Sequence, residues 1–221
     1  YKRQRWRPVA AGELSSRQAT YRGLGLMAAG LAACFLIRPL LGLVGAGYLA
    51  LTLSYSLLWR HILLLDIVAI AGGFVLRAAA GGAAAPVALS RWFLLVITCA
   101  AIFVAAGKRL AELRRIEPGL IGHRRVLARY TEARLQIILL ASAAGAFIAY
   151  CIWAFSIASV NGVPWRPMTV APVALGLVRY GALVRAGGGE APEDLILGDR
   201  GLRVAATLWL VLFALGVHAL S

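Results

Sequence analysis

Three polar residues at the end of a long apolar run have the types and the spacing for phosphate chemistry. The segment 104–115 reads VAAGKRLAELRR, in which Lys108 and Glu112 stand four residues apart and share one face of a helix. Arg109 points about 100° away from Lys108. The cations can bind phosphate oxygens, and Mg²⁺ accepts one or two carboxylates together with substrate phosphates. The alternative is an ion pair between Lys108 and Glu112 that only anchors a membrane helix.

A second polar cluster interrupts the apolar sequence at 53–66, LSYSLLWRHILLLD. Tyr55 and Arg60 can bind a phosphate, or they can be an interfacial aromatic and a topology charge. His61 is more typical of a loop than of a base or a ligand. Asp66 lies about one turn inside its helix, where a charge costs roughly 2.5–3.5 kcal/mol on insertion scales. We therefore expect Asp66 to have a partner or a functional role.

Three further segments carry charged residues next to apolar runs: YKRQRWRPVAAG at 1–12, LARYTEARL at 127–135 and GGGEAPEDLILGDR at 187–200. The first two are also typical of helix anchors, and the third of a flexible linker. Because several connectors supply cations, their convergence favours a polyanionic ligand. The candidate binding residues in these segments are Lys2, Arg3, Arg7, Tyr130, Arg134, Asp194 and Arg200.

The composition indicates an all-α integral membrane protein. Of the 221 residues, 61% are hydrophobic and only 14% are charged, so a soluble fold of this length would lack polar surface. The net charge of +14 resides in connectors rather than on a soluble domain, which favours lipid head groups or a phosphorylated substrate over nucleic acid. The three cysteines are isolated within apolar runs and form no metal or disulfide pattern.

Seven apolar runs are long enough to cross about 30 Å of hydrocarbon. Connectors on one side carry single arginines, at Arg38, Arg91 and Arg166, whereas most other basic residues lie on the opposite side. The positive-inside rule places that second side in the cytoplasm, and the acids accompany it, so we expect a cytoplasmic site. Arg77, towards the outer end of its run, is expected to pair within the bundle or to snorkel outwards. The predicted runs are 20–37, 39–58, 62–83, 90–108, 135–157, 168–184 and 203–220.

The ordered series of these segments resembles the decaprenyl-phosphate phosphoribosyltransferases, a branch of the UbiA-type membrane prenyltransferase superfamily. The resemblance runs from RPVAAG to the C-terminus, and VAAGKRLAEL together with GGGEAPEDLILGDR carries most of it. It implies a helical bundle of nine spans in the plasma membrane, with a cavity open to the cytoplasm. It also implies transfer of 5-phosphoribose from phosphoribosyl diphosphate to a polyprenyl phosphate, with Mg²⁺, for the synthesis of cell-wall arabinan. A homo-oligomer is compatible with it.

The resemblance also implies roles for particular residues. Lys108, Arg109 and Glu112 match the second polar motif and are the predicted catalytic residues, with Glu112 as a metal or ribose ligand. Tyr55 and Arg60 match a tyrosine and a lysine of the family, with arginine here in place of the usual lysine. Three residues match the basic end of the first aspartate-rich motif: Lys2, Arg3 and Arg7.

The resemblance implies that residues 1–221 form one UbiA-like domain holding family helices 3–9. The first two helices and the main metal-binding aspartates are expected upstream of Tyr1, so we expect this segment alone to be inactive. Three alternatives remain at this stage: an aromatic prenyltransferase, a truncated homologue without activity, and a small-molecule transporter. The second polar motif lacks the aspartates typical of aromatic prenyltransferases, and we find no polar mid-membrane residues or broken helices typical of a transporter.

Overall fold

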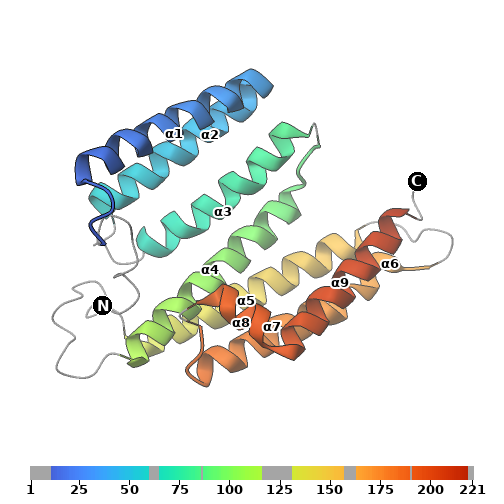
Figure 1. The fold of residues 1–221 in the computed structure, drawn as a ribbon. Coiled ribbons are helices and arrows are strands. Elements are labelled where there is room, and N and C mark those ends of the chain that lie inside the picture. The colour runs from blue at the N-terminus through green and yellow to red at the C-terminus, as the bar shows by residue number, and fades with distance from the viewer. Residues whose placement is uncertain are drawn as a thin grey trace.

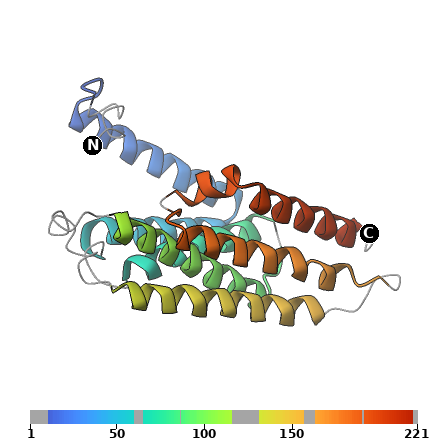
Figure 2. The ribbon, with the colours of Figure 1, turned by 90° about the horizontal axis from the view of Figure 1, so that it is seen from below.

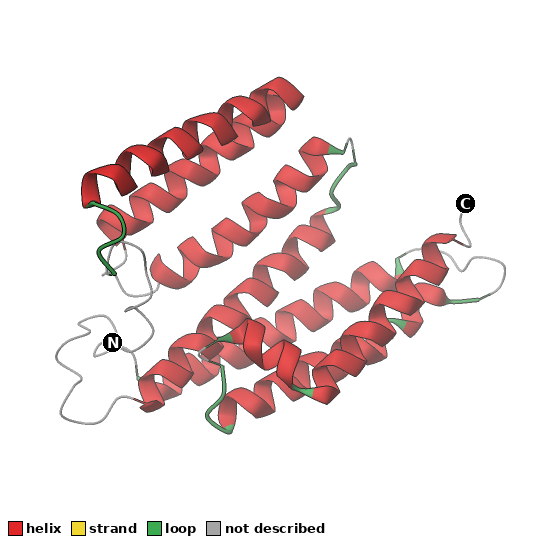
Figure 3. Ribbon diagram, viewed as in Figure 1, coloured by secondary structure: helices red, strands yellow, loops and turns green. Residues whose placement is uncertain are grey.

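The computed structural model describes residues 11–59, 65–85, 87–115, 131–156, 163–189 and 191–218. These residues form helices and turns, with no strand among them (Figure 3). Seven of the helical segments are long and apolar enough to span a membrane. The elements are α1 (Ser16–Ile37), α2 (Pro39–Ser54), a π-helical turn η1 (Tyr55–Trp59), α3 (Leu65–Ala84), α4 (Arg91–Arg115), α5 (Glu132–Phe155), α6 (Trp165–Met168), α7 (Val170–Arg185), α8 (Pro192–Gly198) and α9 (Arg200–His218).

The prediction of an all-α membrane protein with seven spans is confirmed, but two elements differ from the sequence pattern. The fourth run was expected to end at 108, whereas α4 continues to Arg115. The residues beyond 108 are mainly Arg, Leu, Ala and Glu, which favour helix, so α4 extends past the apolar stretch. The connector at 187–200 contains α8, which begins with Pro192 and has Glu193 and Asp194 in its first turn. Both features stabilise a helix N-terminus.

Consecutive long helices pack side by side in alternating directions (Figure 1). α1 and α2 form a hairpin that continues through α3 to α4, and α4 packs most extensively on α5. α7 contacts α4, α5 and α9. In the orthogonal view, α1 and α9 lie along one side of the molecule and α5 along the other (Figure 2).

The best-packed part of the molecule lies among α4, α5 and α7. Leu110 of α4, Leu135 and Leu139 of α5, and Val184 of α7 are almost completely buried there. α1, by contrast, has no buried residue. The helices around α4 therefore form the rigid part of the bundle, and α4 is the helix that carries the predicted catalytic residues.

A buried hydrogen-bond chain joins α5 to α7 and α9 at the end of the bundle where α5 finishes. The Thr169 hydroxyl donates to the carbonyl of Arg166, so the Tyr150 hydroxyl donates to Thr169 Oγ1, at 2.6 Å. Tyr150 in turn accepts a hydrogen bond from Trp209 Nε1 at 2.6 Å. Every polar atom of this chain thus has a partner away from water.

We expect Tyr150→Phe to lower the stability of the protein, because it leaves the indole N–H of Trp209 without its acceptor. The loss of a partner for a buried donor costs about 1–3 kcal/mol. Thermal unfolding in detergent, followed by intrinsic fluorescence, measures the effect. Tyr21→Phe is the matched control, since Tyr21 is 74% exposed. An unchanged midpoint for Tyr150→Phe would contradict the assigned hydrogen bonds.

Candidate functional site

Most of the charged side chains that the structure describes gather at one end of the bundle, which we call the polar end. α3, α5 and α9 begin there, and α4 and α7 end there (Figure 1). The opposite end carries arginines, of which Arg91 stacks on Trp92 and Arg166 on Trp153. All the ion pairs among the described residues lie at the polar end.

Arg109 lies between two carboxylates at the polar end. Its Nε donates to Asp66 Oδ2 of α3 at 2.6 Å, and its Nη1 donates to Glu112 Oε2 at 2.6 Å. Asp66 is 1% exposed and also accepts from the backbone N–H of Ile67 through Oδ1. The prediction that Asp66 requires a partner is therefore confirmed, and Arg109 is one such partner. The pair fixes the guanidinium against α3.

The Lys108–Glu112 ion pair, which was the alternative to phosphate binding, is not formed. Glu112 instead pairs with Arg109, three residues before it. Lys108 is half-buried, and it makes no hydrogen bond or ion pair within the described part of the chain. Tyr55, in η1, lies close enough to Arg109 to interact with it electrostatically. π-helical turns are rare and occur frequently at functional sites. Tyr55, Arg109 and Glu112 are thus brought together, with Asp66 as a fourth member, and Lys108 adjoins Arg109 on α4.

A second arginine ties α4 to its other neighbours. Arg114 Nε donates to Glu132 Oε1 of α5 at 2.9 Å, and its Nη1 donates to the carbonyl of Arg185 at 2.7 Å. That carbonyl belongs to the last residue of α7, where no further helical N–H is available to it. Arg114 therefore joins the end of α4 to the start of α5 and to the end of α7, and its role is structural.

The glycine-rich connector after α7 packs directly on α4 beside Lys108. Gly189 is buried with a φ of +109°, and a Cβ on it would lie 3.0 Å from the Val184 side chain and 3.5 Å from the carbonyl oxygen of Gly107. A larger residue would be strained in this conformation and crowded. A Cβ on Gly107 would itself lie 3.2 Å from the Tyr180 hydroxyl. These glycines thus serve close packing of the connector on α4.

The other end of this connector is fixed by an ion pair between α7 and Asp199, the residue just before α9. Arg179 binds both carboxylate oxygens of Asp199, with Nε–Oδ1 at 3.1 Å and Nη2–Oδ2 at 2.8 Å. Asp199 Oδ1 also accepts from the backbone N–H of Leu202, which caps the start of α9. The Arg179 hydrogen bonds, followed by that backbone N–H, lower the pKa of Asp199 from 3.8 to about 2.

This lowered pKa predicts an acid-dependent contribution of Asp199 to stability. Because the folded-state pKa lies below the unfolded value, the contribution is complete above about pH 4 and disappears as the pH falls towards 2. Asp199→Asn keeps a capping oxygen but loses the charge, so its unfolding midpoint should lie slightly below that of the parent protein near neutral pH. The unfolding midpoints of the variant and of the parent protein should then converge as the pH is lowered from neutral. A difference that stays constant with pH would contradict the ion-pair contribution.

The remaining predicted binding residues are not joined to the Arg109 cluster by any contact that the structure shows. Arg134 is exposed on the first turn of α5, Asp194 is exposed in α8, and Arg200 is exposed at the start of α9. The other predicted residues lie outside the described residues: Lys2, Arg3, Arg7, Arg60 and Tyr130.

Arg77 lies away from the cluster, in the half of α3 distant from Asp66. Its Nη2 donates to the Tyr48 hydroxyl at 2.6 Å, and its guanidinium stacks over the rings of Tyr48 and Phe74. Of the two outcomes expected for Arg77, pairing within the bundle or snorkelling outwards, the structure shows the first.

The described residues do not form a metal site by themselves. Within the ranges that the structure covers, no three potential metal ligands of the His, Cys, Asp and Glu types converge. Glu112 and Asp66 both bind Arg109, which lies between them and neutralises part of their charge. The prediction of Glu112 as a metal or ribose ligand is not tested by this geometry and stays a prediction.

Comparison with known proteins decides which family this arrangement belongs to. Residues 1–197 match the UbiA prenyltransferase family. The chain belongs to that family. Enzymes of the UbiA family are membrane transferases, and they generally use a divalent metal ion.

The similar proteins with assigned activities share one name. Decaprenyl-phosphate phosphoribosyltransferase from Corynebacterium glutamicum is 35% identical over 219 residues, which is 97% of this chain and 66% of that protein. The enzyme of the same name from Mycolicibacterium smegmatis is 35% identical over 94% of this chain and 68% of its own length. The Mycobacterium tuberculosis enzyme is 33% identical with the same coverage. This UbiA-family chain thus spans about two thirds of the length of these relatives.

Proposed function

We propose that this UbiA-family protein transfers 5-phosphoribose from phosphoribosyl diphosphate to a polyprenyl phosphate and releases diphosphate. The observation that carries the proposal is the Asp66–Arg109–Glu112 arrangement, with Tyr55 and Lys108 beside it, at one end of a membrane bundle. The names of these three relatives specify phosphoribosyl transfer to decaprenyl phosphate, which supports the proposed transferred group and acceptor. The product would serve the synthesis of arabinan precursors for the cell wall.

The charges of the described residues suggest separate tasks for the two cations of α4. Asp66, Glu112 and Arg109 together carry one net negative charge, so Arg109 has little attraction left for a diphosphate. Arg109 then positions Glu112, whose carboxylate accepts hydrogen bonds from ribose hydroxyls. Lys108, unpaired within the described residues, contacts the diphosphate. Tyr55 donates a hydrogen bond to the same ligand.

In the proposed reaction, an oxygen of the lipid phosphate attacks C1 of the ribose while the bond from C1 to the diphosphate oxygen breaks. The configuration at C1 inverts, and the diphosphate leaves with the bonding electron pair. The attacking oxygen is already ionised at neutral pH, so no strong general base is required. Lys108 stabilises the charge that develops on the departing diphosphate. The family's divalent metal supplies further charge stabilisation when bound, but we assign it no ligand here.

A diphosphate carries more negative charge than Lys108 alone can neutralise. The basic residues of the flanking segments are proposed to supply it, namely Lys2, Arg3, Arg7, Arg60, Arg134 and Arg200. Most basic residues of the chain lie at the polar end or in segments that adjoin it, so the positive-inside rule favours a cytoplasmic site in the plasma membrane. Phosphoribosyl diphosphate would reach the site from the cytoplasm, and the polyprenyl phosphate from the bilayer.

The decisive experiment supplies both substrates to membranes that contain the protein from its complete coding sequence. Phosphoribosyl diphosphate labelled in the ribose, polyprenyl phosphate and Mg²⁺ are incubated together, and the lipid phase is extracted. Label is expected in the lipid phase only when polyprenyl phosphate is present. A parallel incubation with a prenyl diphosphate and an aromatic acceptor tests aromatic prenyl transfer. Product in that incubation alone would refute the proposed donor and acceptor.

A further inference from the structure

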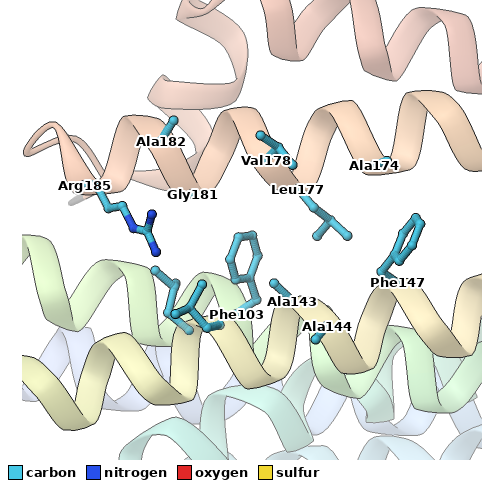
Figure 4. A pocket seen from close by; sticks show the side chains of 12 residues that line it. Phe103, Ala143, Ala144, Phe147, Ala174, Leu177, Val178, Gly181, Ala182 and Arg185 are labelled. Carbon is cyan, nitrogen blue, oxygen red and sulfur yellow. The ribbon is translucent and has the colours of Figure 1, made fainter.

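A groove on the surface of the bundle lies apart from the proposed site. It runs between α5 and α7 over Phe103 of α4 and has a volume of about 450 Å³ (Figure 4). Its other lining residues are apolar except for one, Arg185 at the end of α7. Leu140 is 54% exposed and Val178 is 71% exposed, so the groove opens towards the surroundings of the bundle. An exposed apolar surface of this kind is suited to contact lipid chains.

The length of the groove matches one leaflet of a bilayer. Its lining on α7 extends from Ala174 to Arg185, which at 1.5 Å per residue is about 16 Å. The hydrocarbon core of a bilayer is about 30 Å thick, so one leaflet contributes about half of that length. Because Arg185 lies at the polar end, the groove begins at the membrane surface on that side. Its dimensions therefore suit a single hydrocarbon chain from the adjacent leaflet.

The charge at the mouth of the groove indicates which head group the chain carries. Arg185 extends from α7 towards the neighbouring helices, beside the entrance (Figure 4). Its carbonyl is bound by Arg114, but Arg114 itself is paired with Glu132. The guanidinium of Arg185 makes no ion pair with any described residue. An uncompensated arginine at the end of an apolar groove is complementary to a lipid phosphate.

The position of the groove on α4 separates it from the polar cluster of Arg109 and Glu112. At about 100° per residue, Glu112 lies roughly 180° and Arg109 roughly 120° around the helix from Phe103. The polar cluster and the groove thus occupy different sides of α4. We propose that this groove binds an anionic glycerophospholipid of the adjacent leaflet, with a chain along α5 and α7 and its phosphate on Arg185. The lipid would hold α5 and α7 together and would take no part in the transfer reaction.

Native mass spectrometry of the full-length protein released from detergent tests this binding. Phosphatidylglycerol and phosphatidylcholine with identical chains serve as probes and are titrated separately. We expect tighter binding of phosphatidylglycerol, by about fivefold, the factor expected from one basic residue at an anionic surface. Arg185→Gln should remove that preference. Arg203→Gln is the matched control, because Arg203 is exposed at the polar end but does not line the groove.

A second variant tests the groove without altering its charge. Ala144 lines the groove and is exposed, so Ala144→Phe should fill the space and displace the lipid, with the unfolding midpoint as a check of folding. Equal binding of the two phospholipids by the parent protein would overturn the proposal, as would an unchanged preference in Arg185→Gln. Displacement of phosphatidylglycerol by polyprenyl phosphate would assign the groove to the acceptor. A change of oligomeric mass in Ala144→Phe would assign it to a second copy.

Discussion

Lys108→Ala in the full-length protein is expected to reduce phosphoribosyl transfer by about a hundredfold or more, without reducing the amount of folded protein. Removal of one preorganised group that stabilises transition-state charge typically costs about 10²–10³ in turnover. Lys108 contributes no hydrogen bond or ion pair to the described structure, so its removal leaves the packing of α4 intact. The measurement is transfer of labelled phosphoribose into the lipid phase, together with the unfolding midpoint.

Two further variants make this result specific. Lys108→Arg keeps a cation at the same place and should recover part of the activity, although a guanidinium binds phosphate with a different geometry. Arg203→Ala removes an exposed cation of the polar end and should leave turnover unchanged. Near-normal transfer by Lys108→Ala would refute the proposed contact with diphosphate. Equal losses in Lys108→Ala and Arg203→Ala would indicate that only the general surface charge matters.

The number of spans and their approximate positions along the chain could be predicted from the sequence, because each span depends on local composition. Runs of Ala, Leu, Val and Ile long enough to cross a bilayer specify a helix without reference to their neighbours. The ends of the helices were less predictable, because a helix can continue beyond the apolar stretch that identifies the span. α4 continues to Arg115 because Ala111, Glu112 and Leu113 favour helix, although the segment is no longer apolar. Pro192 and the two acids that follow it are typical of a helix N-terminus and indicate α8. The glycines before Pro192 instead favour a flexible linker, so the helix was not predicted.

The partners of the site residues could be predicted only in part. The cost of a charge within the membrane showed that Asp66 requires a partner, but sequence spacing cannot say which neighbouring helix supplies it. Spacing along α4 suggested Lys108 as the partner of Glu112. In the structure, Glu112 pairs with Arg109 instead. The packing of α3 against α4 places Asp66 on the side of α4 that carries Arg109, and Arg109 binds both carboxylates. Tertiary packing thus decides between two cations that are equally available in the sequence.

Arg109→Met is expected to destabilise the protein more than any other substitution considered for the polar end. Asp66 is 1% exposed and Arg109 is 15% exposed, so the variant removes from a buried carboxylate the guanidinium that binds it at 2.6 Å. Removal of one member of a buried ion pair typically costs about 3–5 kcal/mol, because the remaining charge is uncompensated. The unfolding midpoint in detergent is expected to fall, together with the yield of folded protein.

A double-mutant cycle with Asp66→Asn distinguishes this cause from lost packing. Once the carboxylate of Asp66 is neutral, removal of Arg109 leaves no buried charge against α3, so the double variant should be more stable than Arg109→Met alone. Additive losses would mean that Arg109 stabilises α4 only through the packing of its side chain. Glu112→Gln, whose carboxylate is 14% exposed, should be milder than Asp66→Asn, since water can reach its oxygens. Arg109 would then be a positioning residue that stabilises the bundle through Asp66 and orients Glu112 through its Nη1.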